Sequence, residues 1–167
     1  MEGAPQPPTE STETLECREA LPNEAWLTPW RDEVVEAVGF GPRSMYVEMC
    51  WLPVLGPTST WLYRRLGSWA EFNPEGTTVN LVDLAVSLGL GDSLTKNSKL
   101  NHAIERLARF DALHCTNSSE LQVRTALAPL PGRHLERLSY ASRRLHDELT
   151  RRPPSTLPGQ GTNGAAT

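Results

Sequence analysis

The chain has 167 residues, a length typical of one domain, and its formal net charge is −4. Residues 1–43 carry nine acidic and three basic side chains, whereas residues 60–127 carry seven of each sign. Any nucleic-acid-binding function must therefore depend on local clustering of charge. No run approaches the ~20 apolar residues of a membrane span, and the acidic N-terminus lacks the apolar region of a signal peptide, which predicts a cytoplasmic protein.

The N-terminal part is expected to form an arm followed by helices. Residues 1–24 contain few side chains able to form a core, so we expect a flexible acidic arm, with accessory helices over residues 25–56. The pair Thr28–Pro29 is typical of a helix start, since threonine caps and proline fits the first turn. Gly39 and Gly41 are the stop signals of this short helix.

A second accessory helix is expected after Ser44, a candidate N-cap. It would end before Pro53, because proline disfavours helical geometry in the residue before it. Gly56–Pro57 then signals a turn, and the next helix has the sequence WLYRRLGSWAEF. Its candidate caps are Thr58, Ser59 and Thr60. Its apolar face consists of Leu62, Leu66, Trp69 and Ala70.

The next segment predicts a short strand and a short helix. Residues 77–79 are β-prone, and Asn80 is a good N-cap for a helix over residues 80–88. Gly89 and Gly91 would end that helix by permitting left-handed backbone geometry.

A further helix is predicted over residues 97–110, capped by Asn97 or Ser98. Its apolar stripe consists of Leu100, Ala103, Ile104, Leu107 and Ala108, and its opposite face is polar and basic. Two short helices joined through glycines, the second with such an outer face, are typical of a helix-turn-helix.

The chain then predicts a hairpin and a C-terminal helix. Residues 112–127 show two alternating segments around the turn residues Asn117, Ser118 and Ser119. Residues 131–152 are predicted to be helical, and residues 153–167 to form a disordered tail. The C-terminal helix has leucines at near-heptad spacing, which fits either a helix folded back on the domain or a dimer seam. These leucines are Leu135, Leu138, Leu145 and Leu149, with Ser142 in the gap.

This order of elements resembles the winged helix-turn-helix family of transcription regulators. The residues that carry the resemblance are VNLVDLAVSLGLG, the following KNSKLNHAIERLARFDAL, and the hairpin, which together span somewhat under half of the chain. The flanking WLPVLGPTSTWLYRRL is similar to segments of uncharacterised actinobacterial proteins. The resulting expectation is an α+β fold, mainly helical with a small β-hairpin. A winged helix-turn-helix domain would occupy residues 57–130, with extra helices on both sides and disordered tails.

The resemblance implies DNA binding, with the helix 97–110 in the major groove and the hairpin, or wing, beside the backbone. Lysine, arginine and asparagine side chains can pair with base edges, each good pair contributing ~1–3 kcal/mol of discrimination. The residues implied to contact DNA are Lys96, Asn97, Ser98, Lys99, Asn101, His102, Glu105, Arg106 and Arg109, with Asn117, Ser118 and Ser119 at the wing. Residues 93–110 carry a local charge of +3, but the wing tip has no cation, so phosphate contacts would depend on the helix.

Two functions are compatible with these patterns. The first is a DNA-binding transcription regulator, expected to be a homodimer because one module with few phosphate contacts binds weakly at cellular salt. The second is a winged-helix protein-interaction module that does not bind DNA, in which the outer helix face is solvated and the tryptophan-rich N-terminal helices contact a partner.

The sequence indicates neither an enzyme nor a cofactor. No phosphate loop, nucleophile elbow or cluster of carboxylates occurs. The three cysteines are widely separated, and the adjacent His114 and Cys115 would point to opposite faces of a strand, so no metal site is predicted. Reduced thiols are expected, which agrees with a location in the cytoplasm, at the nucleoid if the protein binds DNA.

Overall fold

The computed structural model describes residues 20–117 and 119–151. Its strands are β1 (Glu24–Trp30), β2 (Thr77–Asn80), β3 (Leu113–Asn117) and β4 (Glu120–Arg124). Its helices are α1 (Glu33–Val38), the π-helix η1 (Val47–Trp51), α2 (Leu52–Leu55), α3 (Pro57–Phe72), α4 (Leu81–Ser87), α5 (Lys99–Arg109), α6 (Gly132–Leu135) and α7 (Tyr140–Arg151). The predicted α+β class is confirmed. Most of the acidic arm, Ser118 and the predicted tail lie outside the described residues.

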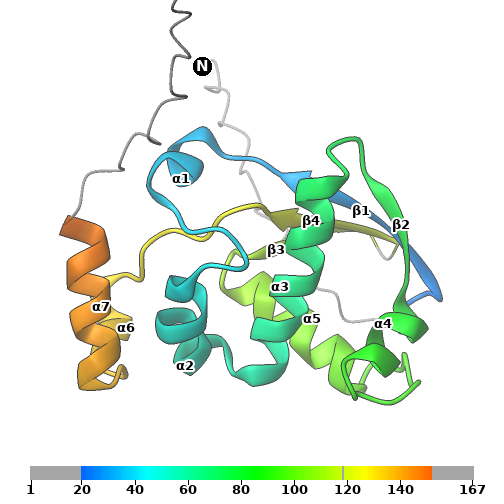
Figure 1. Ribbon diagram of the computed structural model, residues 1–167. Coiled ribbons are helices and arrows are strands. Elements are labelled where there is room, and N and C mark those ends of the chain that lie inside the picture. The colour runs from blue at the N-terminus through cyan, green and yellow to red at the C-terminus, as the bar shows by residue number, and fades with distance from the viewer. Residues whose placement is uncertain (1–19, 118, 152–167) are drawn as a thin grey trace, which may run out of the picture.

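The sheet is larger than the predicted hairpin, because the four strands form one mixed sheet in the order β2-β1-β4-β3 (Figure 1). β1 is antiparallel to β2, with Ala25 opposite Val79, and parallel to β4, with Leu27 opposite Leu121. β3 and β4 form the predicted antiparallel hairpin. β1 therefore separates β2 from the hairpin and joins them in one sheet.

The accessory helix predicted to start at Thr28–Pro29 is wrong, because these residues belong to β1. Ala25 and Leu27 are buried and Trp26 is exposed, which is the alternation of a strand with one covered face. β2 ends opposite Leu27, so Pro29 has a neighbouring strand on one side only, where proline is tolerated. The helix α1 is shorter than predicted and is capped by Asp32, whose Oδ1 accepts hydrogen bonds from two backbone amides.

The second accessory helix does not end before Pro53. Ser44 is the predicted cap, since its Oγ accepts a hydrogen bond from Val47 N at 3.2 Å, but the helix continues through η1 into α2. Pro53 lies in the first turn of α2, where its missing amide proton has no helical acceptor to satisfy. Gly56 then turns the chain with φ +80°, and α3 begins at Pro57, so the three predicted caps lie inside its first turn.

The caps of α4 and α5 were predicted correctly. The Oδ1 atom of Asn80 accepts from Asp83 N at 2.9 Å, and the Oγ atom of Ser98 accepts from Asn101 N at 3.2 Å. Gly89 has the positive φ expected of a residue that ends α4. The two helices nevertheless have different packing partners, since α4 packs mainly against β1 and β2, whereas α5 packs against α3 and β3. The long connection between them lets each helix bury its apolar face against the sheet layer.

The core lies between the sheet and the helices α3 and α5. Its largest fully buried side chains include Leu27, Tyr63, Leu66, Ile104 and Leu107. Burying each large aliphatic side chain stabilises the fold by about 1.5–3 kcal/mol. This layer fixes α5 against the sheet and leaves the opposite face of the helix to solvent.

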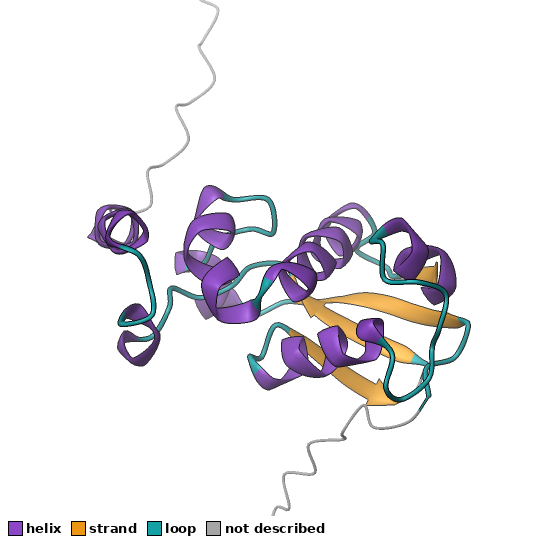
Figure 2. Cartoon of the chain, turned by 90° about the horizontal axis from the view of Figure 1, so that it is seen from below, coloured by secondary structure: helices purple, strands orange, loops and turns teal. Residues whose placement is uncertain are grey.

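The C-terminal segment forms two helices instead of one, and α7 folds back on η1. The hydroxyl of Tyr46 hydrogen-bonds His146 Nδ1 at 2.6 Å and accepts from Leu130 N at 2.9 Å. Leu138 is buried, and the other three leucines of the stripe pack against the core. Figures 1 and 2 place α6 and α7 at the end of the molecule away from the sheet. The leucine stripe is thus covered within the chain, which is the folded-back alternative.

The cysteines differ from the expectation of reduced thiols. Cys115 is disulfide-bonded, whereas Cys50 is a free, buried thiol. Burial raises the pKa of the Cys50 thiol to about 11, so this thiol is protonated at neutral pH. The cysteines therefore do not support the cytoplasmic location that was inferred from them.

Candidate nucleic-acid interface

Helix α5 presents a basic face to solvent. Its apolar side chains Leu100, Ile104 and Leu107 are buried against the sheet layer, so the opposite face is exposed. The exposed side chains of that face are Lys99, His102, Arg106 and Arg109. They are positioned by a regular helix capped at Ser98, which fixes their spacing.

Two of the residues predicted to contact DNA are structural. Asn101 is fully buried, and its Nδ2 donates a hydrogen bond to Lys96 O at 2.9 Å. Ser98 is also buried, and its hydroxyl caps α5. The turn before α5 folds over the first turn of the helix and removes these side chains from solvent. Both predictions of DNA contact are therefore wrong for this conformation.

The remaining predicted residues of the helix are accessible. Lys96 and Asn97 are exposed in the turn that precedes α5, next to Lys99 in its first turn. Glu105 is the acidic residue of this face, and its Oε2 lies 3.5 Å from His102 Nδ1. The acidic charge is thus directed toward His102, within a segment whose local charge is +3.

A groove of about 460 Å³ lies between the basic face of α5 and the junction of α2 with α3. Its lining residues include Gly56, Thr58, Ser59, Lys99, His102, Arg106 and Arg109. The N-cap of α3 is Gly56, which provides no side-chain hydrogen bond, so the first-turn amides of this long helix have no side-chain cap. The positive end of the helix dipole and three cationic side chains therefore converge on one groove.

The side chain of Arg106 is held in place at this groove. Its Nη2 donates to Val54 O, the carbonyl of a residue in α2, at 2.6 Å, and its guanidinium lies 5.7 Å from the ring centroid of Phe110. One edge of the guanidinium is thus fixed by the protein. Arg109 and Lys99 flank it on the same helix face, so the groove combines an oriented cation with two exposed ones.

The wing provides hydrogen-bonding groups that are already paired with one another. The Oδ1 atom of Asn117 accepts from the backbone N and the hydroxyl of Ser119 at 2.9 and 3.0 Å, and its Nδ2 donates to Glu120 at 3.2 Å. Ser119 O accepts from Trp26 N at 2.8 Å, which ties the hairpin tip to β1. Ser118 lies outside the described residues. The described wing residues thus supply no cation for a phosphate.

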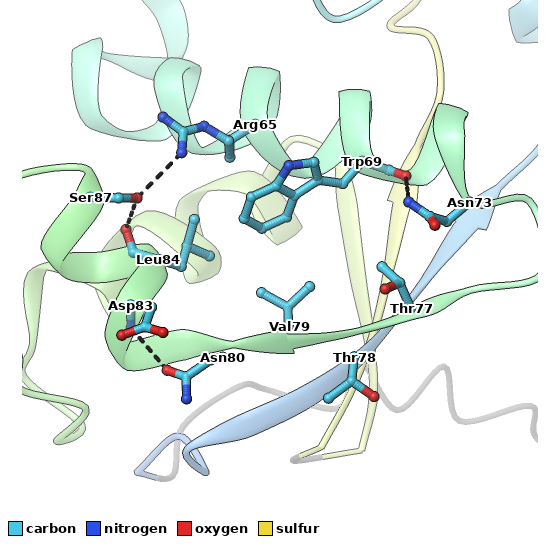
Figure 3. Close-up of a pocket in the computed structure, with 10 residues that line it drawn as sticks. All are labelled: Arg65, Trp69, Asn73, Thr77, Thr78, Val79, Asn80, Asp83, Leu84 and Ser87. Atoms are coloured by element: carbon cyan, nitrogen blue, oxygen red, sulfur yellow. Dashed lines mark hydrogen bonds between the residues drawn. The ribbon is translucent and has the colours of Figure 1, made fainter.

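A second groove, of about 470 Å³, lies between α3, β2 and α4 (Figure 3). Trp69, Val79 and Leu84 form its centre. At its rim Arg65 donates to Ser87 at 3.4 Å, and Asp83 carries the opposite charge. This groove has balanced charge and is less suited to a polyanion than the groove beside α5.

No known protein family, curated protein or solved structure matches this chain. Function must therefore be inferred from the geometry of the sites themselves. Within residues 20–117 and 119–151, no three histidine, cysteine, aspartate or glutamate side chains are grouped so that they could hold a metal ion. None of the helices in the described part is both long and apolar enough to cross a membrane.

The contribution of the α2–α3 junction was missed at the level of sequence. Val54, Gly56 and Ser59 are distant from α5 along the chain, and nothing in their identity indicates that they border it. The Gly56–Pro57 turn was recognised, and with it came one usable signal. A long helix that begins at Pro57 after a glycine lacks a side-chain cap, which leaves its first turn open to an anion.

Proposed function

We propose that this chain binds double-stranded DNA through α5 and acts as a transcription regulator. The observation that carries the proposal is the convergence of Lys99, Arg106, Arg109 and the first turn of α3 on one groove. A solvated helix face needs polar residues, but it does not need its cations beside an uncapped helix N-terminus. A nucleic-acid backbone supplies anionic groups in the regular array that such a surface binds.

The residues have different proposed roles. Lys96, Asn97 and Lys99 lie at the N-terminal end of α5, which is the end that reads base edges when a recognition helix enters the major groove. Arg106 and Arg109 lie in the last turn and beside the start of α3, so they contact phosphates. A homodimer belongs to the same proposal, because two such modules would double the number of phosphate contacts.

The test is salt-dependent binding of a short random-sequence duplex by the full chain, followed by fluorescence anisotropy. We expect the double variant Lys99→Ala, Arg109→Ala to bind at least ~10-fold more weakly at low salt. The slope of log K against log salt should fall in magnitude by about 1.8, since each lost phosphate contact removes about 0.9. The matched control is Arg143→Ala, Arg144→Ala, which removes two exposed arginines of α7 and should leave both quantities unchanged.

Two outcomes would contradict the proposal: no salt-sensitive binding by the wild type, or equal losses in the two double variants. Either would favour the protein-interaction module. That alternative is motivated by the exposed apolar side chains of the N-terminal half, where Val34 is 77% exposed, Met45 64% and Trp61 57%. Sedimentation of the free protein and of the duplex complex would test the proposed homodimer separately.

A further inference from the structure

A third cavity, of about 540 Å³, lies behind the C-terminal end of α5. Four parts of the chain converge on it: α1, η1, the end of α5 with the turn that follows, and the segment 127–134. Its volume lies within the range of roughly 300–1,000 Å³ that is typical of pockets for small molecules. No element of the described chain fills it, and the DNA-binding proposal does not use it beyond sharing Arg109 at its rim.

The walls of this cavity are flat and aromatic. The rings of Trp51 and Phe110 meet edge to face with centroids 6.3 Å apart, and the ring of His134 lies 5.6 Å from that of Phe110. Trp51 is fixed by a hydrogen bond from its Nε1 to Ala128 O at 3.1 Å. Pro129 and Pro131 add further rigid, apolar lining. Such walls suit a planar ring, which gains both apolar burial and stacking.

One arginine of the cavity is structural. Arg124 donates from Nε to Asp111 O at 2.7 Å and from Nη1 to Asp32 Oδ2 at 3.2 Å, and it stacks over Trp30 at 3.8 Å. Its side chain is only 11% exposed. Asp111 has φ +61°, a left-handed conformation that is uncommon outside glycine. Arg124 thus holds this turn in place and shapes the wall of the cavity.

Two other arginines face the same cavity and are exposed. Arg109 comes from the last turn of α5, and Arg133 comes from the short helix α6. The carboxylate of Asp111 lies 3.8 Å from Arg124, which offsets its charge. Arg109 and Arg133 therefore leave the cavity with a positive balance, and an arginine fork is well suited to a carboxylate or a phosphate.

We propose that this cavity binds a small anion that carries a planar ring, with the ring against Phe110 and Trp51 and the anionic group between Arg109 and Arg133. A nucleoside monophosphate and an aromatic carboxylate share this chemistry. The stacked walls distinguish such a ligand from a simple anion, and the two arginines distinguish it from a neutral aromatic compound. The site requires neither DNA nor a second copy of the chain.

The test is calorimetric titration of the full-length protein, without DNA, with four probes: adenosine 5′-monophosphate, benzoate, adenosine and inorganic phosphate. We expect at least one ring-bearing anion to bind with Kd below ~1 mM, and adenosine and phosphate each to bind at least ~10-fold more weakly. Binding of the nucleotide alone would identify a phosphate ligand, and binding of benzoate alone would identify a carboxylate ligand.

The variant Arg133→Ala should raise the Kd at least ~10-fold, and Phe110→Leu should raise it while keeping apolar bulk. The control Arg143→Ala removes an exposed arginine outside the cavity and should leave the Kd unchanged. The proposal is overturned if no ring-bearing anion binds, if phosphate binds as tightly as the nucleotide, or if Arg133→Ala and Arg143→Ala behave alike. None of these results affects the DNA-binding test, whose variants leave Arg133 and Phe110 intact.

Discussion

The hydroxyl group of Tyr46 joins three parts of the chain that are distant in sequence, and we expect the fold to depend on it. It accepts a hydrogen bond from Leu130 N at 2.9 Å and lies 2.6 Å from His146 Nδ1. Tyr46 is fully buried, Leu130 is 3% exposed and His146 is 9% exposed. Tyr46→Phe removes only the hydroxyl and keeps the ring that stacks on Phe40 at 3.8 Å.

The magnitude follows from what is left unpaired. A buried backbone amide without an acceptor costs about 1–3 kcal/mol, and loss of the second bond adds about 1 kcal/mol. We expect Tyr46→Phe to lower the free energy of unfolding by ~2–4 kcal/mol, a large part of the roughly 5–15 kcal/mol of a typical domain. The corresponding decrease in Tm is roughly 5–15 °C.

Urea unfolding followed by circular dichroism measures this change, and hydrogen exchange measures whether protection is lost first in α7. Tyr140→Phe is the matched control, because Tyr140 is 75% exposed and its change should stay within about 0.5 kcal/mol. If Tyr46→Phe is as stable as the control, the hydroxyl does not hold the segment at Leu130 and α7 together, and the reasoning is refuted.

Two further predictions concern a turn and a helix cap. Gly76 has φ +96°, and a Cβ there would lie 2.7 Å from the ring of Trp26, so Gly76→Ala should destabilise the fold by ~1–3 kcal/mol, whereas Gly132→Ala, with open space around it, should change stability by less than about 0.5 kcal/mol; equal urea midpoints for the two variants would contradict this. The amide of Val35 and then Arg124 lower the pKa of Asp32 below its usual 3.8, so its stabilising effect is present above that value and is lost as pH falls through the lowered pKa. Asp32→Ala should therefore be less stable than the wild type at pH 7, with a difference that shrinks at about pH 3, and a difference independent of pH would exclude this linkage.

Local signals predicted the part of the fold that is encoded in neighbouring residues. Asn80 and Ser98 cap their helices because a short polar side chain can reach the amide three residues on, which needs no tertiary contact. The apolar stripe of α5 was read correctly for the same reason, since helical spacing alone places Leu100, Ile104 and Leu107 on one face.

β1 could not be predicted in this way. Its strand conformation depends on pairing with β2 and β4, which are far along the chain, and the local Thr28–Pro29 signal points to a helix. The candidate site shows the same limit. Sequence indicated a basic face on α5, but burial of Asn101 depends on the turn at Lys96, and the position of Arg106 depends on Val54 in another helix.

The position of β1 also bears on where DNA would be bound. In the described structure the tip of the hairpin is tied to β1 through Ser119 O and Trp26 N, and its polar side chains are paired with one another. The hairpin therefore completes the sheet and offers no cation to a phosphate. The cations lie instead on the side of α5 that faces the start of α3, with Arg106 oriented by the carbonyl of Val54. A DNA contact surface on this protein would consequently be centred on α5 and the first turn of α3, with the wing contributing rigidity to the sheet that carries them.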